Sequence, residues 1–266
     1  MTRSFSHLSR AVAALALLML GACASMPGFG PGGADTVASG RSTLDDKARV
    51  QLRLARAAQE SGDGGSAIRL YRAVLDQAPG HIGARVGLGE ALDEAGASRD
   101  AVSELRRAVA ATPDNAEAQM ALGRALVHTH APEEALQRFD AVLKRDDGDL
   151  RALSNRGVAL DMAGRHTEAQ ADYRRVLAAD PNNVAASVNL GLSLALMGNG
   201  REAVAILEGL VRNGVDSPRV RQNLALAYGL KGDAEAAART AHLDLDDAGV
   251  RANLAFYDTV RPMAAR

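Results

Sequence analysis

Apolar residues recur three, four and seven positions apart along most of the chain, which is the spacing of one face of an α-helix. The arrangement returns every 34 residues, and it is seen most simply in Ala67, Ala101, Ala135, Ala169, Ala203 and Ala237. Counting from residue 48 gives six repeats: 48–81, 82–115, 116–149, 150–183, 184–217 and 218–251. The predicted core residues lie at repeat positions four, seven, eleven, twenty-four and twenty-seven, and include Leu88, Leu92, Leu105, Leu122, Leu126, Phe139, Val142, Leu190, Leu194, Leu207 and Leu210.

Each repeat also places small or turn-forming residues where two helices would meet. Position eight holds only alanine or glycine, and position twenty is alanine, so two helices can approach closely at both positions. Position fifteen is glycine except for His130 in the third repeat, and glycine readily adopts the left-handed conformation that ends a helix. Prolines such as Pro79, Pro113 and Pro181 stop the second helix. Each repeat is therefore predicted to be a helical hairpin.

Departures from the pattern occur in the fourth and sixth repeats. Arg156 replaces an apolar residue at position seven, and we expect its side chain to turn outward to solvent. Ala241 and Asp244 weaken the second helix of the sixth repeat. Residues 249–266 predict a capping helix and tail, because terminal elements commonly cover the last exposed repeat. The apolar residues of this segment are Leu254, Phe256 and Tyr257.

The 34-residue period, with its small residue at position eight and its turn glycine, resembles the tetratricopeptide repeat over residues 48–251. The resemblance implies an all-α fold, a right-handed α-solenoid of about six helix-turn-helix repeats with a C-terminal capping helix. In such solenoids the first helices of the repeats line a concave surface that holds segments of other proteins.

The first residues have the plan of an exported lipoprotein. An apolar run at residues 11–20 follows Arg3 and Arg10, and it is too short to span a bilayer. The segment ends in Leu-Gly-Ala before Cys23, the only cysteine, and so resembles the lipobox of bacterial lipoproteins. The resemblance implies a signal peptide at 1–22 and a lipid attached covalently to Cys23. The alternative is that Cys23 is a buried, inert thiol.

The segment at 23–47 is rich in proline and glycine, and it cannot bury enough apolar surface to fold alone. We interpret it as a flexible tether, which as a random coil would span about 25 to 30 Å. Ala24 occupies the place where an inner-membrane retention aspartate often stands in lipoproteins. The resemblance therefore implies an outer-membrane destination that faces the periplasm of a Gram-negative bacterium.

Charge and composition argue against several classes of function. The 31 basic residues are balanced by 32 acidic ones, and the chain has no Trp, 4 Phe and 4 Tyr, so neither an electrostatic grip on nucleic acid nor base stacking is supported. The glycines at 62–65 lack the Gly-Lys-Ser/Thr ending of a phosphate-binding loop. Six repeats, a tether and a signal leave no segment for a catalytic domain. We predict a protein that is not an enzyme.

Histidines after the predicted signal do not form a metal-binding motif. No His-Glu-x-x-His pair is present, and we interpret these side chains as surface residues near turns. They are His81, His128, His130, His166 and His242. No metal site, catalytic residue or cofactor is predicted, apart from the lipid on Cys23.

The tetratricopeptide resemblance places groove residues at positions two, five, nine and twelve of each first helix. In the last three repeats, Val158, Val188, Leu192 and Leu226 predict a shallow apolar strip that accepts an amphipathic or extended segment of a partner protein. The alternative is that some of these side chains pack under neighbouring helices or under the capping helix.

The third repeat contributes Met120 and Arg124 to the same groove, at a place where charges flank aliphatic residues. No clamp of lysines and asparagines for a terminal carboxylate is present. Asn155, Asn189 and Asn223 recur at position six, and their recurrence in register favours a role in building the repeat over a role as ligands.

The complete layout resembles a narrower family, the TadD lipoproteins of Flp (tight adherence, Tad) pilus assembly. The most specific part is the closing segment 221–230, followed by Asn253-Leu254-Ala255. The resemblance implies an outer-membrane lipoprotein that helps the pilus secretin insert, assemble or stay stable, as a pilotin-like platform. Its partners would be the secretin or other Flp pilus components. The alternatives are a scaffold for peptidoglycan enzymes or another envelope machine and, more remotely, a hydrolase.

Overall fold

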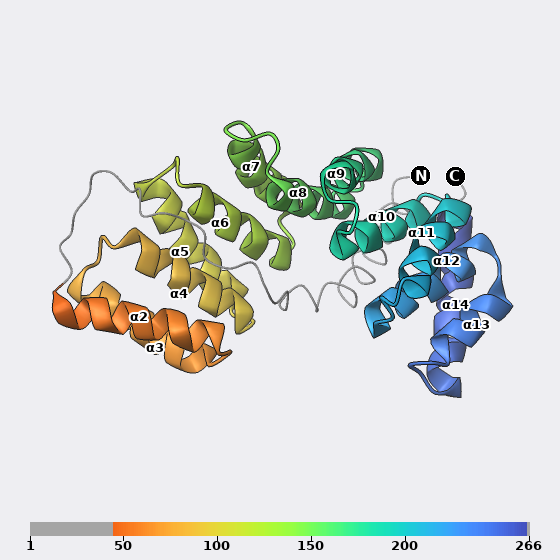
Figure 1. The fold of residues 1–266 in the computed structure, drawn as a ribbon, viewed down its shortest axis with the longest axis horizontal. Helices are drawn as coiled ribbons and strands as arrows, with labels where there is room; N and C mark the ends of the chain where they lie inside the picture. The colour runs from red at the N-terminus through yellow and green to blue at the C-terminus, as the bar shows by residue number, and fades with distance from the viewer. Residues whose placement is uncertain (1–44, 265–266) are drawn as a thin grey trace, which may run out of the picture. The chain divides into compact units, whose positions relative to one another are not determined.

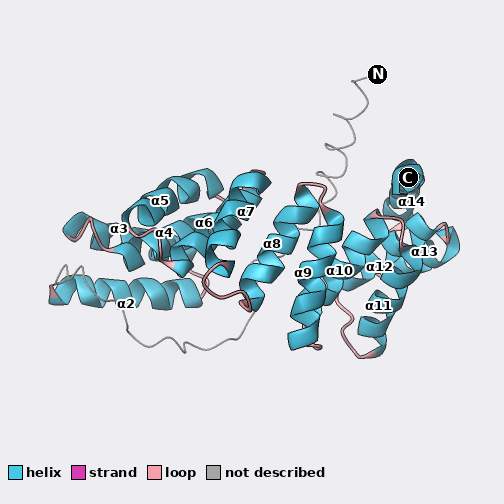
Figure 2. Cartoon of the chain, turned by 90° about the horizontal axis from the view of Figure 1, so that it is seen from above, coloured by secondary structure: helices cyan, strands magenta, loops and turns pink. Residues whose placement is uncertain are grey.

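The computed structural model describes residues 45–264, and every regular element in that range is an α-helix (Figures 1 and 2). The predicted signal peptide, Cys23 and the tether up to residue 44 lie outside the described residues. The helices are α2 (Asp46–Glu60), α3 (Gly64–Gln77), α4 (Ile82–Glu94), α5 (Ser98–Ala111), α6 (Ala116–His128), α7 (Pro132–Leu143), α8 (Leu150–Met162), α9 (His166–Ala179), α10 (Val184–Leu196), α11 (Gly200–Arg212), α12 (Pro218–Lys231), α13 (Ala234–Ala241) and α14 (Asp247–Ala264).

The chain divides into two compact parts. The N-terminal half, ending at Arg145, contains α2 to α7, and the C-terminal half, from Asp146, contains α8 to α14. Within each half, consecutive helices pack as antiparallel pairs, one pair to a repeat. The expectation of an all-α solenoid built from helical hairpins is confirmed. None of the helices in the described range is long and apolar enough to cross a membrane.

The first helix of each repeat begins at a capping residue just before the predicted repeat boundary. Side chains of Asp45, His81, Asn115, Asp149, Asn183 and Ser217 each accept a hydrogen bond from a backbone N–H in the first helical turn. Such caps satisfy donors that the helix itself leaves without partners. The cap at Asp45 starts α2 two residues before the predicted boundary, whereas the other five first helices begin at the predicted residue.

Small residues at position eight allow the two helices of a repeat to touch. A Cβ atom placed on Gly123 would lie 2.4 Å from the ring of Phe139, and one on Gly157 would lie 2.4 Å from the ring of Tyr173. The corresponding distance from Gly89 to Leu105 is also 2.4 Å. Because packed carbon atoms need about 3.5 to 4 Å, no larger residue fits there without movement of the opposite side chain.

The turn at position fifteen requires a left-handed backbone. Its φ angle is 78° at Gly96 and 74° at Gly164. In the third repeat His130 takes the same conformation with φ 58°, the one positive φ among non-glycine residues of the described range. The prediction of a helix-ending turn at this position is confirmed, and His130 adopts a conformation that costs a side-chain-bearing residue free energy.

The expectation for Arg156 was wrong. Its Nε and Nη2 atoms donate to the two carboxylate oxygens of Asp172 at 2.8 and 2.7 Å, and Asp172 is only 3% exposed. A bidentate guanidinium partner satisfies a carboxylate that would otherwise be costly to bury. Arg156 therefore turns toward α9 and joins the two helices of its repeat.

The last repeat ends as its sequence suggested. Helix α13 has only eight residues, and α14 packs against both α12 and α13. Ala241 occupies position twenty-four, where the other repeats have a leucine or an aromatic residue, and its small side chain forms a core with Ala225 and Val250, against which Leu254 packs. The predicted terminal helix therefore fills space that the weakened second helix leaves.

Candidate functional site

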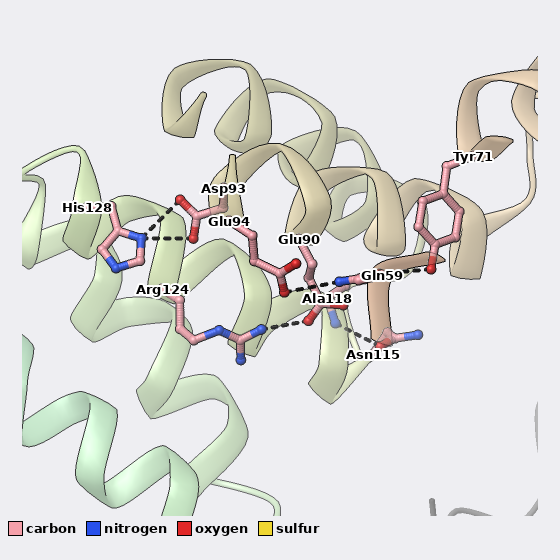
Figure 3. Close-up of polar contacts among 9 residues, drawn as sticks. All are labelled: Gln59, Tyr71, Glu90, Asp93, Glu94, Asn115, Ala118, Arg124 and His128. Carbon is pink, nitrogen blue, oxygen red and sulfur yellow. Dashed lines mark hydrogen bonds and ion pairs between the residues drawn. The ribbon is translucent and has the colours of Figure 1, made fainter. Parts of the chain in front are cut away.

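The groove positions of the N-terminal half carry a set of charged side chains that bridge neighbouring first helices (Figure 3). Position nine is Arg56 on α2, Glu90 on α4 and Arg124 on α6. Arg124 donates through Nη2 to Oε1 of Glu90 at 2.6 Å. Burial raises the pKa of the Glu90 carboxyl, and the Arg124 guanidinium opposes that rise. The predicted groove residue Arg124 is thus held by a carboxylate from the preceding repeat.

Further contacts extend this set along the three helices. The Nδ1 atom of His128 lies 2.8 and 3.0 Å from the carboxylate oxygens of Asp93, and Gln59 donates to Glu94 at 3.1 Å. The Tyr71 hydroxyl donates to Gln59 at 2.9 Å. Burial acts to raise the pKa of Asp93, but hydrogen bonds from His128 and Ser98 outweigh it and hold that pKa below its ordinary value. We call the residues Gln59, Glu90, Asp93, Glu94, Arg124 and His128 the polar ladder.

Most aliphatic residues at the groove positions of the N-terminal half are buried, although Leu52 is partly exposed. Met120 is only 2% exposed, and Val86 and Val127 are also buried. The expectation that Met120 lines an open groove does not fit its burial, whereas the partly exposed Arg124 remains at the surface.

The C-terminal half differs from the N-terminal half at the same repeat positions. Val158 and Met162 of α8, and Leu192 and Leu196 of α10, occupy positions nine and thirteen, and all four are partly exposed. Positions four apart lie on one face of a helix, and α8 contacts α10. These four residues form what we call the aliphatic patch.

Only half of the predicted apolar strip belongs to this patch. Val158 and Leu192 are partly exposed, but Val188 is 2% exposed and Leu226 is fully buried. Val188 packs in the interior of the array, and Leu226 lies on α12, against which both α10 and α14 pack. Sequence reasoning missed Met162 and Leu196, although their spacing of four residues from Val158 and Leu192 was a signal that could have found them.

A carboxylate at the end of α8 gathers several polar side chains beside the patch. Asp161 accepts hydrogen bonds from the Ser193 hydroxyl at 2.7 Å and the Tyr173 hydroxyl at 3.0 Å. The Nδ1 atom of His166 lies 2.8 Å from the same carboxylate. In a Ser-His-Asp relay the histidine lies between the serine and the carboxylate, but here both contact the carboxylate. The arrangement fixes these side chains and does not resemble a nucleophilic centre.

The asparagines at position six have unlike surroundings. Asn155 donates to the carbonyl of Arg151 at 2.8 Å, and the Oδ1 of Asn189 accepts from Arg219 at 3.1 Å. Asn223 is 1% exposed, and its amide atoms have no hydrogen-bond partner among the described residues. Contacts within and between helices account for the first two, and we find no physical reason for the third.

Candidate metal ligands do not come together. Within residues 45–264, no three His, Cys, Asp or Glu side chains are placed to hold one ion. His81 caps α4 by accepting a hydrogen bond from the Ala84 N–H at 2.9 Å, and His128 and His166 each contact an aspartate. These three histidines therefore serve helix capping and side-chain pairing.

Comparisons with known proteins agree with this geometry. Family models described as tetratricopeptide repeat match residues 58–111, 94–155, 162–227 and 131–184, well over half of the chain. No curated protein matches the chain.

Solved structures show the same fold at low sequence identity. A tetratricopeptide repeat protein from Parabacteroides merdae is 14% identical, with a TM-score of 0.57 over 80% of this chain and 100% of that one. MamA from Desulfovibrio magneticus is 19% identical, with a TM-score of 0.59 over 65% and 99%. YrrB, described as a tetratricopeptide repeat protein with an unusual peptide-binding site, is 21% identical, with a TM-score of 0.53 over 64% and 88%. This chain belongs to the tetratricopeptide repeat family.

Proposed function

We propose that this protein is a non-enzymatic scaffold, anchored to the outer membrane by a lipid on Cys23, that assists assembly of the Flp (Tad) pilus secretin as TadD-like lipoproteins would. Tetratricopeptide repeat proteins bind protein partners and are typically scaffolds without catalytic activity. The observation that carries the proposal is the contrast between the polar ladder and the aliphatic patch. Both occupy positions nine to thirteen of successive first helices.

The aliphatic patch by itself suits a protein segment with an apolar face. Burial of the aliphatic patch against a partner would stabilise the complex by about 25 cal/mol per Å² of apolar surface removed from water. The polar ladder already has internal partners, so it discriminates among partners more than it adds affinity. The peptide-binding site of YrrB is consistent with peptide recognition on the shared fold.

Anchoring would make a modest affinity sufficient. A tether that spans about 25 to 30 Å holds the repeats near the membrane, and confinement of that kind raises the effective concentration of a membrane partner into the millimolar range. Support for the lipid and for the pilus comes from the sequence, namely the lipobox-like segment before Cys23 and the closing segment 221–230.

The experiment that tests the patch is a binding titration with the purified secretin of the same bacterium. Leu192→Glu places a charge in the aliphatic patch, and we expect it to weaken binding at least tenfold. The matched control is Leu243→Glu, because Leu243 is 68% exposed and lies outside the patch. Circular dichroism checks that both variants are folded. Equal affinity of wild type and Leu192→Glu contradicts the assignment of the patch, and no binding by wild type contradicts the secretin as partner.

A further inference from the structure

The first helix of the array exposes a face that later first helices bury. Positions three and seven of α2 are Val50 and Leu54, with 43% and 52% of their surface exposed. Within each half, α4, α6, α10 and α12 pack on the second helix that precedes them. Their residues at positions three and seven are all buried: Ala84, Leu88, Ala118, Leu122, Ala186, Leu190, Val220 and Leu224. The face of α2 therefore has the composition of an interface between repeats.

The sixth repeat provides a chemical match for this face. Val220 and Leu224 have the same residue types at the same positions as Val50 and Leu54, and they are only 1% and 6% exposed. Helix α12, which carries them, packs against α11. In the sixth repeat, this valine and leucine pair is therefore buried by helix packing.

The C-terminal helix of the array, α14, has a polar outer face. Helix α14 buries Val250, Tyr257 and Val260 toward the array, and it exposes Arg251 and Asp258. A polar outer face of this kind keeps a terminal element of a repeat array soluble. The apolar face of α2 does not follow that rule, which indicates that another element covers it.

Charged residues beside the apolar face of α2 indicate what kind of element covers it. Asp46, Arg53 and Glu60 are exposed and lie seven residues apart, so they flank Val50 and Leu54 along one side of α2. In an antiparallel pair of two α2 helices, Arg53 would lie opposite its own copy and Asp46 opposite Glu60. In a parallel pair, Lys47 would meet its own copy beside the apolar seam. Like charges so placed disfavour a second copy of this chain.

The sequence before α2 supplies no suitable helix either. The apolar run at residues 11–20 belongs to the predicted signal peptide, and the segment from residue 27 to residue 40 is rich in proline and glycine and has no apolar stripe of helical period. We propose that the face formed by Val50, Leu54 and Ala57 binds an amphipathic helix of a different protein. That helix would present an apolar seam flanked by basic, acidic and basic residues at seven-residue spacing, facing Asp46, Arg53 and Glu60. This surface lies on α2 and is independent of the aliphatic patch and of the secretin.

The test uses the full-length chain in its native cells, with a photo-crosslinking p-benzoylphenylalanine at position 54. The matched control carries the same residue at position 243, since Leu243 is exposed and apolar but lies in the last repeat. We expect position 54 to cross-link at least tenfold more than position 243, to one segment of another protein with the stated helical pattern. Cross-linking to lipid, to a second copy or to a segment without that pattern overturns the proposal, as does a yield equal to the control.

A second measurement separates direct docking from incidental proximity. A synthetic peptide of the cross-linked segment is titrated against wild type, Val50→Glu/Leu54→Glu and Arg53→Glu, with folding checked by circular dichroism. We expect at least tenfold weaker binding to both variants, and recovery of the Arg53→Glu affinity when the acidic residue of the peptide is changed to lysine. Unchanged affinity of the folded double variant contradicts docking on this face.

Discussion

The size of the residue at position eight of a repeat is limited by how closely the second helix of that repeat approaches it. Position eight is small because a bulky side chain from position twenty-four lies directly over it, as Phe139 does over Gly123. The aromatic ring is fully buried, so it cannot move into solvent to make room. The two helices can approach this closely because Gly123 carries a hydrogen atom where other residues carry a Cβ.

Gly123→Ala is expected to destabilise the fold. A Cβ only 2.4 Å from the Phe139 ring places the overpacking cost at about 2–3 kcal/mol, and the better helix propensity of alanine returns up to about 1 kcal/mol, so the free energy of unfolding falls by about 1–3 kcal/mol. Urea denaturation measures it. Gly64→Ala is the control, because nothing lies within 4 Å of a Cβ at that site. Equal stability of Gly123→Ala and wild type would show that the helices are not in tight contact.

Sequence reasoning succeeded for position eight and failed for Arg156, for one physical reason. A small residue in register needs no knowledge of its partner, since any close helix contact requires it. The direction of an arginine depends on where a carboxylate lies, and Asp172 is sixteen residues away on another helix. Periodicity marks Arg156 as a departure but does not identify the side chain that it contacts.

At the scale of helices, side-chain pairs between repeats add to the apolar packing. Asp93 of α4 contacts His128 of α6, and the pKa of Asp93 lies below its ordinary value of 3.8. A carboxyl group with a lowered pKa in the folded state stabilises the protein above its unfolded pKa, and this contribution is lost as the pH falls through the folded pKa.

Asp93→Asn is therefore expected to lower the free energy of unfolding by about 1.5–3 kcal/mol near neutral pH, which is the usual value of a hydrogen bond to a charged group. The difference from wild type should be complete above about pH 5 and should shrink as the pH falls from about 4 toward 2. Urea denaturation at several pH values measures the difference. A difference that stays constant with pH would mean that the Asp93 charge does not contribute.

The starts of the six first helices and of α14 were predictable to within two residues, because caps, turns and apolar stripes are local signals. The burial of side chains at the groove positions was harder to predict from the sequence. The periodic pattern predicts one buried face and one exposed face for each first helix. Val188 and Leu226 lie on the face predicted to be exposed, but neighbouring helices cover them. Which side chains stay accessible depends on both neighbours, and that information is not contained in the pattern of a single helix.

At the scale of the whole molecule, the proposed function joins a membrane anchor to a protein-binding array. The repeats supply contrasting faces in the two halves, a polar ladder and an aliphatic patch, and the proposed lipid on Cys23 supplies location. In this proposal the anchor raises the effective concentration of a membrane partner, and the fold of the array does not depend on the anchor.

The most direct test is affinity purification of the tagged, lipidated protein from native membranes after mild cross-linking, with mass spectrometry of the proteins recovered. Cys23→Ser, which cannot be lipidated, is the comparison. We predict recovery of the secretin or other Flp pilus components with wild type, and at least tenfold less with folded Cys23→Ser. Recovery of cell-wall enzymes in place of pilus components, or equal recovery of the secretin without the lipid, would contradict the proposed function.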